Sequence, residues 1–218
     1  MNKIVKTSDG SHTIYVPELD EHYHSIHGAI QESNHIFINS GFDACKAEPV
    51  RILEIGFGTG LNAFLTFLRA ESMNRTVHYT AIEKFPLSIE TARELNYHEF
   101  AGQKSREILL KLHEVEWNHE IMLSDFFTIE KLSDDFTSLK LKGKYDLVYF
   151  DAFGPDKQPE MWTGEMFLKI SKATVSGGIL VTYSAKGEVK RHLKAANYKV
   201  ELLPGPPGKR QISRAVKI

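Results

Sequence analysis

The stretch Val50–Leu68, VRILEIGFGTGLNAFLTFL, decides the fold. It begins with a short apolar run, turns through GFGTG at residues 56–60, and continues with apolar residues at helical spacing as far as Leu68. A strand, a glycine turn and a helix in this order bring backbone N–H groups and a helix N-terminus up to a bound ligand. The turn needs glycine, because a Cβ would hinder positive φ angles and the close approach of a ligand.

The spacing of the glycines indicates which ligand is bound. A dinucleotide-binding turn, GxGxxG, would need its third glycine at position 61, where the chain has Leu61. The pattern here is an acid followed by alternating glycines: Glu54, Gly56, Gly58 and Gly60. This pattern resembles motif I of S-adenosylmethionine-dependent methyltransferases, and the resemblance places Glu54 near the amino-acid end of the cofactor. An ordinary strand–helix turn is the alternative.

Length and composition limit the architecture. A chain of 218 residues suits one large α/β domain. We therefore expect a single domain over residues 1–218, with a hairpin and substrate-side segment in 1–45 and a Rossmann-like core in 46–218. The single cysteine, Cys45, excludes an intramolecular disulfide framework and a CxxC metal site. No apolar signal segment or membrane span is present, so we expect a cytoplasmic protein that does not bind membranes.

Charge is distributed unevenly. The formal net charge is −1, which argues against a general binder of polyanions. Residues 186–218, however, contain nine Lys or Arg and only two Glu. This basic region suits local contact with a phosphate backbone, although a solvated helix face beside a basic edge strand explains it equally well.

Apolar runs alternate with helical segments along the chain, which predicts a doubly wound α/β sheet. Asp9-Gly10 predicts a hairpin between Lys3–Thr7 and His12–Val16. The expected parallel strands are Val50–Ile55, Val77–Glu83, His119–Leu123, Tyr145–Asp151 and Ile179–Tyr183. An antiparallel pair, Tyr198–Leu203 and Gln211–Ile218, follows them. This is the layout of a class I methyltransferase sheet with a C-terminal antiparallel hairpin. A helical insert at 96–121 has no assigned role.

Two further acids follow expected strands. Glu83 ends the second strand, where a carboxylate can accept both ribose hydroxyl protons of a nucleoside; a solvated acid at a strand end is the alternative. Asp125 and Phe126 follow the expected third strand. They could receive the adenine amine and wall its ring, or Asp125 could simply cap the next helix.

The loop DAFGPDKQPEMW at 151–162 is the candidate acceptor site. The strand before it delivers Asp151 to the carboxyl edge of the sheet, where open α/β sheets bind ligands. Methyltransferases acting on nitrogen carry an Asp or Asn followed by Pro and an aromatic residue here, and this loop resembles that pattern with extra residues. A carboxylate can orient an amine through its N–H groups and stabilise the charge that develops on nitrogen. It also favours the ammonium form, so a proton must leave first.

Four stretches together resemble the methyltransferase domain of the MnmC family: ILEIGFGTGLNAF, YDLVYFDAFGPDKQPEMW, GGILVTYSAKGEVKRHLKAANYKV and PGKRQISRA. The resemblance runs from about Tyr23 to the C-terminus. It implies methylation of the 5-aminomethyl group of (2-thio)uridine at the tRNA wobble position, with S-adenosyl-L-methionine as methyl donor, to give 5-methylaminomethyl-2-thiouridine. Bifunctional members carry a second, flavin-dependent oxidase domain, for which this chain has no room, so it resembles a stand-alone, MnmD-like enzyme. Upstream tRNA-modifying enzymes would act on the same nucleoside.

The resemblance and the spacing together give the expected site residues. Asp151 is the expected catalytic residue. The expected cofactor-binding residues are Glu54, Gly56, Gly58, Gly60, Asn62, Glu83, Lys84, Asp125, Phe126 and Asp151. The expected contacts to the anticodon loop of tRNA are Phe153, Pro155, Trp162, Tyr183, Lys209 and Arg210, with Lys157, Lys190 and Arg191 as further phosphate contacts.

Some alternatives stay open. His22, His24 and His27 lie within six residues, but no ligand spacing supports a metal, and a surface or substrate-facing loop is the preferred interpretation. A small-molecule N-methyltransferase would leave the basic region as plain surface. A nicotinamide-dependent oxidoreductase is disfavoured by Leu61. A non-catalytic Rossmann-like binding protein is disfavoured by the set Glu54, Glu83 and Asp151.

Overall fold

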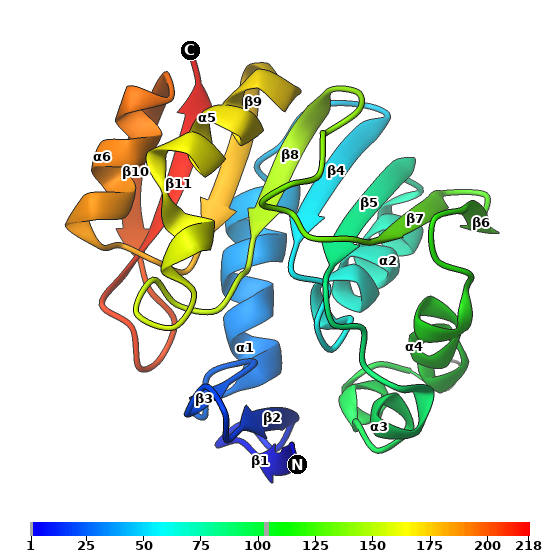
Figure 1. Cartoon of the computed structure of the whole chain (residues 1–218). Coiled ribbons are helices and arrows are strands. Elements are labelled where there is room, and N and C mark those ends of the chain that lie inside the picture. Colours follow the sequence, from blue (N-terminus) through cyan, green and yellow to red (C-terminus); the bar gives the residue numbers. More distant parts are fainter. Residues whose placement is uncertain (1, 103–104) are drawn as a thin grey trace.

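The computed structural model describes residues 2–102 and 105–218 (Figure 1). Residues 103 and 104 of the predicted insert, and residue 1 of the predicted domain, lie outside the described residues. The chain forms one large sheet of eight strands and one small sheet of three. Helices cover both faces of the large sheet, and the small sheet lies below its carboxyl edge in Figure 1.

The large sheet has the strand order β10-β11-β9-β8-β4-β5-β7-β6. Five neighbouring strands are parallel: β9 (Thr174–Thr182), β8 (Tyr145–Phe150), β4 (Val50–Ile55), β5 (Val77–Glu83) and β7 (Phe127–Ser133). The C-terminal strands β10 (Tyr198–Pro204) and β11 (Gln211–Lys217) pair antiparallel, and β11 is antiparallel to β9. The predicted fold class, a methyltransferase-like parallel sheet with a C-terminal antiparallel hairpin, is confirmed.

The prediction of the third parallel strand is wrong. The segment we expected there is β6 (Glu120–Ser124), an edge strand that runs antiparallel to β7. Asp125 and Phe126 form the turn between these two strands. The carbonyl of Phe126 accepts a hydrogen bond from the N–H of Val77, the first residue of β5, at 2.8 Å. This turn therefore lies at the amino edge of the sheet, opposite the edge that Glu83 reaches.

Alternation along the strands divides the core into two layers. Ile52, Tyr79 and Tyr149 point to one face, and their neighbours along the strands, such as Leu53 and Val148, point to the other. These parallel strands are buried on both faces and read as nearly continuous apolar runs, as in YDLVYF of β8.

Different helices cover the two faces (Figure 1). On one side lie α2 (Leu61–Met73) and a continuous helical stretch made of α1 (Ala29–Ser33) and the π-helix η1 (Asn34–Phe42). On the other side α5 (Gly164–Ala173) and α6 (Gly187–Ala195) pack together against β9 and β10. The predicted insert contains the short helix η2 (Tyr97–Phe100) and α4 (Ser105–Glu114), preceded by α3 (Ile89–Arg93). One further turn, η3 (Pro159–Trp162), follows β8.

The N-terminal segment forms the small sheet. β1 (Lys3–Lys6) and β2 (His12–Val16) make the predicted hairpin, with Lys3 opposite Tyr15, and β3 (Glu21–His22) adds to β2. From there the chain passes the carboxyl edge of the large sheet before it enters α1. The N-terminal residues thus lie beside the ends of the parallel strands.

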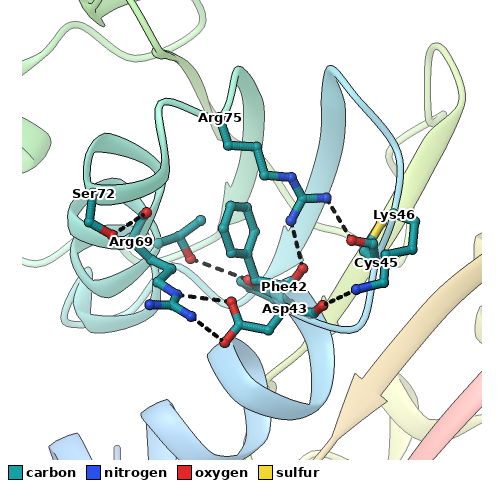
Figure 2. A network of polar contacts seen from close by, with 9 residues as sticks. Phe42, Asp43, Cys45, Lys46, Arg69, Ser72 and Arg75 are labelled. Atoms are coloured by element: carbon teal, nitrogen blue, oxygen red, sulfur yellow. Dashed lines mark hydrogen bonds and ion pairs between the residues drawn. The ribbon is translucent and has the colours of Figure 1, made fainter.

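Polar contacts hold the end of η1 against α2 (Figure 2). The Arg75 guanidinium is almost buried and donates to the carbonyls of Phe42 at 2.8 Å and of Cys45 at 2.7 Å. Arg69 of α2 makes a two-pronged ion pair with Asp43, at 2.9 and 3.0 Å. Such bidentate arginine contacts fix orientation as well as distance. They anchor the helical stretch that carries the N-terminal segment to the core.

Candidate active site

The glycine turn between β4 and α2 has the backbone that its sequence requires. Gly56 and Gly58 have φ angles of 93° and 50°. A Cβ on Gly56 would lie 2.7 Å from the Asp151 carbonyl oxygen, and one on Gly58 would lie 2.9 Å from the Tyr23 ring. Both glycines line a cavity at the carboxyl edge of the sheet. The turn is therefore closed to side chains and open to a close ligand.

Glu83 fixes this turn from the neighbouring strand. One carboxylate oxygen accepts the Gly58 N–H at 2.9 Å, and the other accepts the Phe85 N–H at 2.8 Å. Glu83 and Lys84 both line the cavity, and the Lys84 ammonium pairs with Asp135 at 2.7 Å. The structure thus brings Glu83, Lys84, Gly56 and Gly58 together, as the sequence predicts.

Three of the expected cofactor residues lie beneath the turn instead of facing the cavity. Gly60 caps the start of α2, while Glu54 and Asn62 are buried. Within the described residues, neither Glu54 carboxylate oxygen has a hydrogen-bond partner. Burial, and next the charge of Asp151, raise the pKa of Glu54 well above its ordinary value. Glu54 therefore supports the site from below.

The predicted insert braces the turn from the side away from the cavity. His113, near the end of α4, donates through Nε2 to the Thr59 carbonyl at 3.0 Å. Burial lowers the pKa of His113 to about 4, so the ring is neutral with its proton on the donating nitrogen. A Cβ on Gly60 would lie 2.9 Å from that nitrogen. The insert thus has a structural role that its sequence did not reveal.

Asp151 lies directly after β8 and faces the same cavity. One carboxylate oxygen accepts the Asn62 amide N–H at 2.8 Å. Burial raises the pKa of Asp151 to about 7; the Asn62 hydrogen bond opposes the rise, the charge of Glu32 adds to it, and the charge of Lys209 opposes it. This carboxyl group can exchange a proton near neutral pH.

Aromatic side chains surround Asp151. Phe153 and Tyr23 pack edge to face with ring centroids 5.0 Å apart, and both line the cavity together with Tyr183. The Tyr183 hydroxyl donates to the Ala152 carbonyl at 2.8 Å. Trp162 lies away from the cavity: it is 3% exposed and donates its indole N–H to the Phe153 carbonyl at 2.7 Å. Trp162 thus stabilises the loop through a contact outside the cavity.

The remaining predicted residues differ in whether they line the cavity. Lys209 lines the cavity, whereas its neighbour Arg210 is exposed outside it. Pro155 does not contribute to the lining. Asp125 and Phe126 lie at the opposite edge of the sheet, so their prediction as cavity residues is wrong. The residues that follow the true third strand, Asp134–Phe136, line the cavity in their place.

The histidine segment faces the cavity, in line with the preferred interpretation of a substrate-facing loop. His22, His24 and His27 all contribute to its lining. His24 is buried and contacts the Thr59 hydroxyl at 2.7 Å, and burial lowers its pKa to about 4. Among residues 2–102 and 105–218, no group of three or more His, Cys, Asp or Glu side chains could hold a metal ion.

The cavity has a volume of about 500 Å³, within the usual range for small-molecule sites. We divide its lining into two walls. The strand-end wall comprises Gly56–Thr59, Glu83–Phe85 and Asp134–Phe136. The assembled wall comprises Glu21–His27, Glu32, Phe153, Tyr183 and Lys209. Asp151 adjoins both walls, because its carbonyl oxygen lies next to Gly56 and its carboxylate interacts with the charges of Glu32 and Lys209. Close backbone approach at Gly56 and Gly58, with the Glu83 carboxylate beside them, fits a nucleoside cofactor such as S-adenosyl-L-methionine.

Sequence reasoning missed several cavity residues. In the sequence FTIEKLS at Phe127–Ser133, the apolar residues Phe127 and Ile129 alternate with the polar residues Thr128 and Glu130, which is the pattern of a strand. Reading that pattern would have placed Asp134–Phe136 at the ligand edge. Tyr23 and Glu32 carry no comparable local pattern, because only the packing of the N-terminal segment brings them to the cavity.

Comparison with known proteins agrees with this geometry. A family model described as S-adenosyl-L-methionine-dependent methyltransferase matches residues 88–218. The chain is 31% identical, over 97% of its length, to the tRNA 5-methylaminomethyl-2-thiouridine biosynthesis bifunctional protein MnmC of Cupriavidus metallidurans. It is 30% identical, over 93% of its length, to the protein of the same name from Campylobacter fetus. The chain spans about a third of the length of these relatives, 33% and 34% respectively.

A solved structure extends the comparison to three dimensions. The crystal structure of MNMC2 from Aquifex aeolicus matches with a TM-score of 0.83 at 27% identity, covering 99% of this chain and 70% of that chain. The family model thus matches more than half of this chain. The same chain has the strand order, the glycine turn and the cavity at the carboxyl edge described above. On this evidence the chain belongs to the S-adenosyl-L-methionine-dependent methyltransferase family, and S-adenosyl-L-methionine is its methyl donor.

Proposed function

We propose that this protein methylates the nitrogen of the 5-aminomethyl group of (2-thio)uridine at the tRNA wobble position, giving 5-methylaminomethyl-2-thiouridine. The observation that carries the proposal is that Asp151 lines the cavity next to Gly56 of the strand-end wall and within reach of the charges of Glu32 and Lys209 of the assembled wall. The nature of the acceptor is supported by the similarity to MnmC proteins over nearly the whole chain. In this proposal the methyl donor lies along the strand-end wall and the uridine along the assembled wall.

Methyl transfer to an amine has a strict requirement for the nitrogen. The lone pair forms the new N–C bond while the S–C bond of the sulfonium donor breaks and its electrons return to sulfur. An ammonium group has no free lone pair, so the protonated form of a primary amine must lose one proton to become the nucleophile. The product nitrogen then carries the positive charge, which a neighbouring carboxylate stabilises.

Asp151 suits both tasks. As a carboxylate it accepts an N–H of the amine and so orients the lone pair. With its pKa near 7, it can also take the proton that the ammonium form must lose and pass it to water, which restores the carboxylate before methyl transfer. Asn62 holds one carboxylate oxygen at 2.8 Å, which leaves the other oxygen for the acceptor. Tyr23 and Phe153 offer ring faces and edges against which a uracil base could stack.

The tRNA would reach the cavity through its anticodon loop. A wobble base is already in a loop, so turning it into a cavity costs on the order of a few kcal/mol or less. Lys190, Arg191 and Arg210, together with Lys157, remain the proposed phosphate contacts outside the cavity. Upstream tRNA-modifying enzymes would supply the aminomethyl group, and a cytoplasmic location follows from this substrate. Nowhere in the described part does a helix have the length and apolar character that a membrane span needs.

A transfer assay tests the proposal. The purified protein is mixed with methyl-labelled S-adenosyl-L-methionine and tRNA isolated from cells whose wobble uridines stop at the aminomethyl stage. We expect label in the wobble nucleoside, and a rate that falls as salt rises because phosphate contacts contribute to binding. Label in small amines but not in this tRNA would instead support the small-molecule N-methyltransferase.

A further inference from the structure

Lys209 occupies an unusual position for a residue of a basic, phosphate-binding region. Lys209 lines the cavity, and its side chain is only 30% exposed. The ammonium lies 3.3 Å from a Glu32 carboxylate oxygen and 4.8 Å from the centre of the Tyr183 ring. The backbone on either side supports this arrangement, because Gly208 packs so tightly against the His27 ring that a Cβ would lie 2.2 Å from it.

Glu32 is built to hold this ammonium. It lies in α1, is 8% exposed, and accepts the Ser25 N–H at 2.8 Å with its other carboxylate oxygen. A carboxylate fixed by the backbone on one side and facing an ammonium on the other sets the position of that charge. Glu32 and Tyr183 contact Lys209, and Asp151 interacts with its charge. The other titratable residues of the assembled wall are Glu21, His22, Tyr23, His24 and His27.

Lys209 and Asp151 affect one another electrostatically. The charge of Lys209 favours the ionised form of Asp151, while the charge of Glu32 opposes it. A cation that acts on this carboxylate also acts on any amine bound to it. Such a cation disfavours a second positive charge nearby, and like charges at short range shift a pKa by about one unit or more. The ammonium form of a primary amine would therefore lose its proton more readily here than in the same cavity without the Lys209 charge.

We propose that Lys209, held in place by Glu32, keeps the acceptor amine of the proposed reaction in its neutral, nucleophilic form through its fixed positive charge. The proposal rests on the proposed function, since it requires an amine acceptor at Asp151. The proton leaves the ammonium for Asp151 or water, and the neutral nitrogen then accepts the methyl group. Glu32 is a positioning residue for Lys209, and its own charge opposes that of Lys209 at Asp151.

This role differs from the phosphate contact that the sequence suggests for both Lys209 and Arg210. Arg210 is exposed, outside the cavity, and has no side-chain ion pair within the described residues. Only Arg210 is free to meet a backbone phosphate without breaking a contact. In this proposal Lys209 acts on the amine, and Arg210 contacts the RNA backbone.

The experiment measures kcat and KM against pH, with tRNA carrying 5-aminomethyl-2-thiouridine, for the wild type and the variants Lys209→Met, Lys209→Arg, Glu32→Gln and Arg210→Met. The acid limb of the kcat profile reports the protonation of the bound amine. In Lys209→Met we expect the acid limb of the profile to move up by about one pH unit, so that activity near pH 7 falls about tenfold and recovers at higher pH. Glu32→Gln removes the negative charge that opposes Lys209, so its acid limb should lie at lower pH than that of Lys209→Met. Lys209→Arg keeps the charge and stays close to the wild type.

Arg210→Met is the matched control. It should raise KM and reduce the salt dependence without moving the acid limb. Affinity for S-adenosyl-L-methionine, measured for each variant, confirms that the cavity has formed.

Three outcomes contradict the proposal. An unmoved limb in Lys209→Met, with only KM and salt dependence altered, would make Lys209 a phosphate contact. Loss of activity in both Lys209→Met and Lys209→Arg, with no recovery at high pH, would make the Lys209 amine a proton acceptor in its own right. If the wild type itself fails to methylate this tRNA at every pH, the proposed function fails, and the role of Lys209 falls with it.

Discussion

The two walls of the cavity are built in different ways. The strand-end wall comes from the loops after β4, β5 and β7, three neighbouring parallel strands whose ends meet at one edge. The assembled wall combines residues from both ends of the chain, from Glu21 to Lys209, and it exists only because the N-terminal segment and the C-terminal turn pack together. The first wall depends on sheet geometry and the second on tertiary contacts.

This difference indicates which substitutions should alter the backbone of the strand-end wall and which should alter protonation at Asp151. Backbone groups of the glycine turn and the Glu83 carboxylate shape the strand-end wall, so a change there alters the backbone itself. Side-chain charges dominate around Asp151, so a change there alters protonation while the fold persists. Substitutions in the two regions should therefore affect different measurements.

The largest effect is expected for Gly56→Ala. The new Cβ would lie 2.7 Å from the Asp151 carbonyl oxygen, and the φ angle of 93° is unfavourable for alanine. We expect affinity for S-adenosyl-L-methionine to fall on the order of a hundredfold or more, because both walls meet at this contact.

Gly143→Ala is its matched control, measured by calorimetric titration alongside it. Gly143 has a similar φ of 86°, and a Cβ there would meet no heavy atom within 4 Å. It should cost about 1 kcal/mol of stability and leave donor affinity unchanged. Equal donor affinity in both variants would contradict the role assigned to the turn.

Asp151→Asn is expected to separate binding from chemistry. The amide keeps the shape of the side chain but carries no negative charge and accepts no proton. Turnover in a single-turnover assay should fall by at least about tenfold, while affinity for S-adenosyl-L-methionine stays close to that of the wild type. An unchanged single-turnover rate would remove Asp151 from the mechanism.

The same substitution should change how stability depends on pH. The pKa of Asp151 in the folded protein is about 7, above its ordinary value of 3.8, so ionisation costs stability as pH rises from about 4 through 7. In urea unfolding, Asp151→Asn should be more stable than the wild type by about 4 kcal/mol near pH 8, and the difference should shrink toward zero as pH falls to about 4.

Asp146 provides a control of opposite sign. Burial raises its pKa, but the ion pair and hydrogen bonds with Arg51 outweigh burial and hold it below its ordinary value. Its ionised form therefore contributes stability above the ordinary pKa, and that contribution is lost as pH falls through the lowered value. Asp146→Asn should destabilise the protein near pH 8. A loss of stability in both variants would contradict the electrostatic account of Asp151.

The smallest effect distinguishes the two acids at opposite edges of the sheet. Asp134→Asn changes a residue of the strand-end wall and should weaken binding of S-adenosyl-L-methionine by about two- to fivefold, the size of one exposed polar contact. Asp125→Asn changes the turn at the amino edge and should leave this affinity unaltered. Titrations that give the reverse order would restore Asp125 to the site.

The sequence predicted the strand-end wall better than the assembled wall. Alternating glycines after an apolar run, and an acid at the end of the next strand, are local patterns that place Gly56, Gly58 and Glu83 correctly. The error at Asp125 arose because β6 and β7 form a hairpin, and a short apolar run does not show its direction. Locating the third parallel strand required the strand pairing itself.

The assembled wall could be predicted only in part. Asp151 follows a fully buried strand, so its place at the carboxyl edge was evident. Trp162 was expected at the substrate, but the structure gives it a supporting place, because its indole N–H needs the Phe153 carbonyl. The pairing of Glu32 with Lys209 joins residues 177 positions apart in the chain, and no local pattern encodes such a contact.

One measurement tests the central claim most directly: mass spectrometry of the wobble nucleosides of tRNA from cells that lack the gene for this protein. The account predicts that 5-aminomethyl-2-thiouridine accumulates and 5-methylaminomethyl-2-thiouridine disappears, and that the wild-type gene, but not Asp151→Asn, restores the methylated form. An unchanged nucleoside profile, in cells with no other enzyme for this step, would contradict the account.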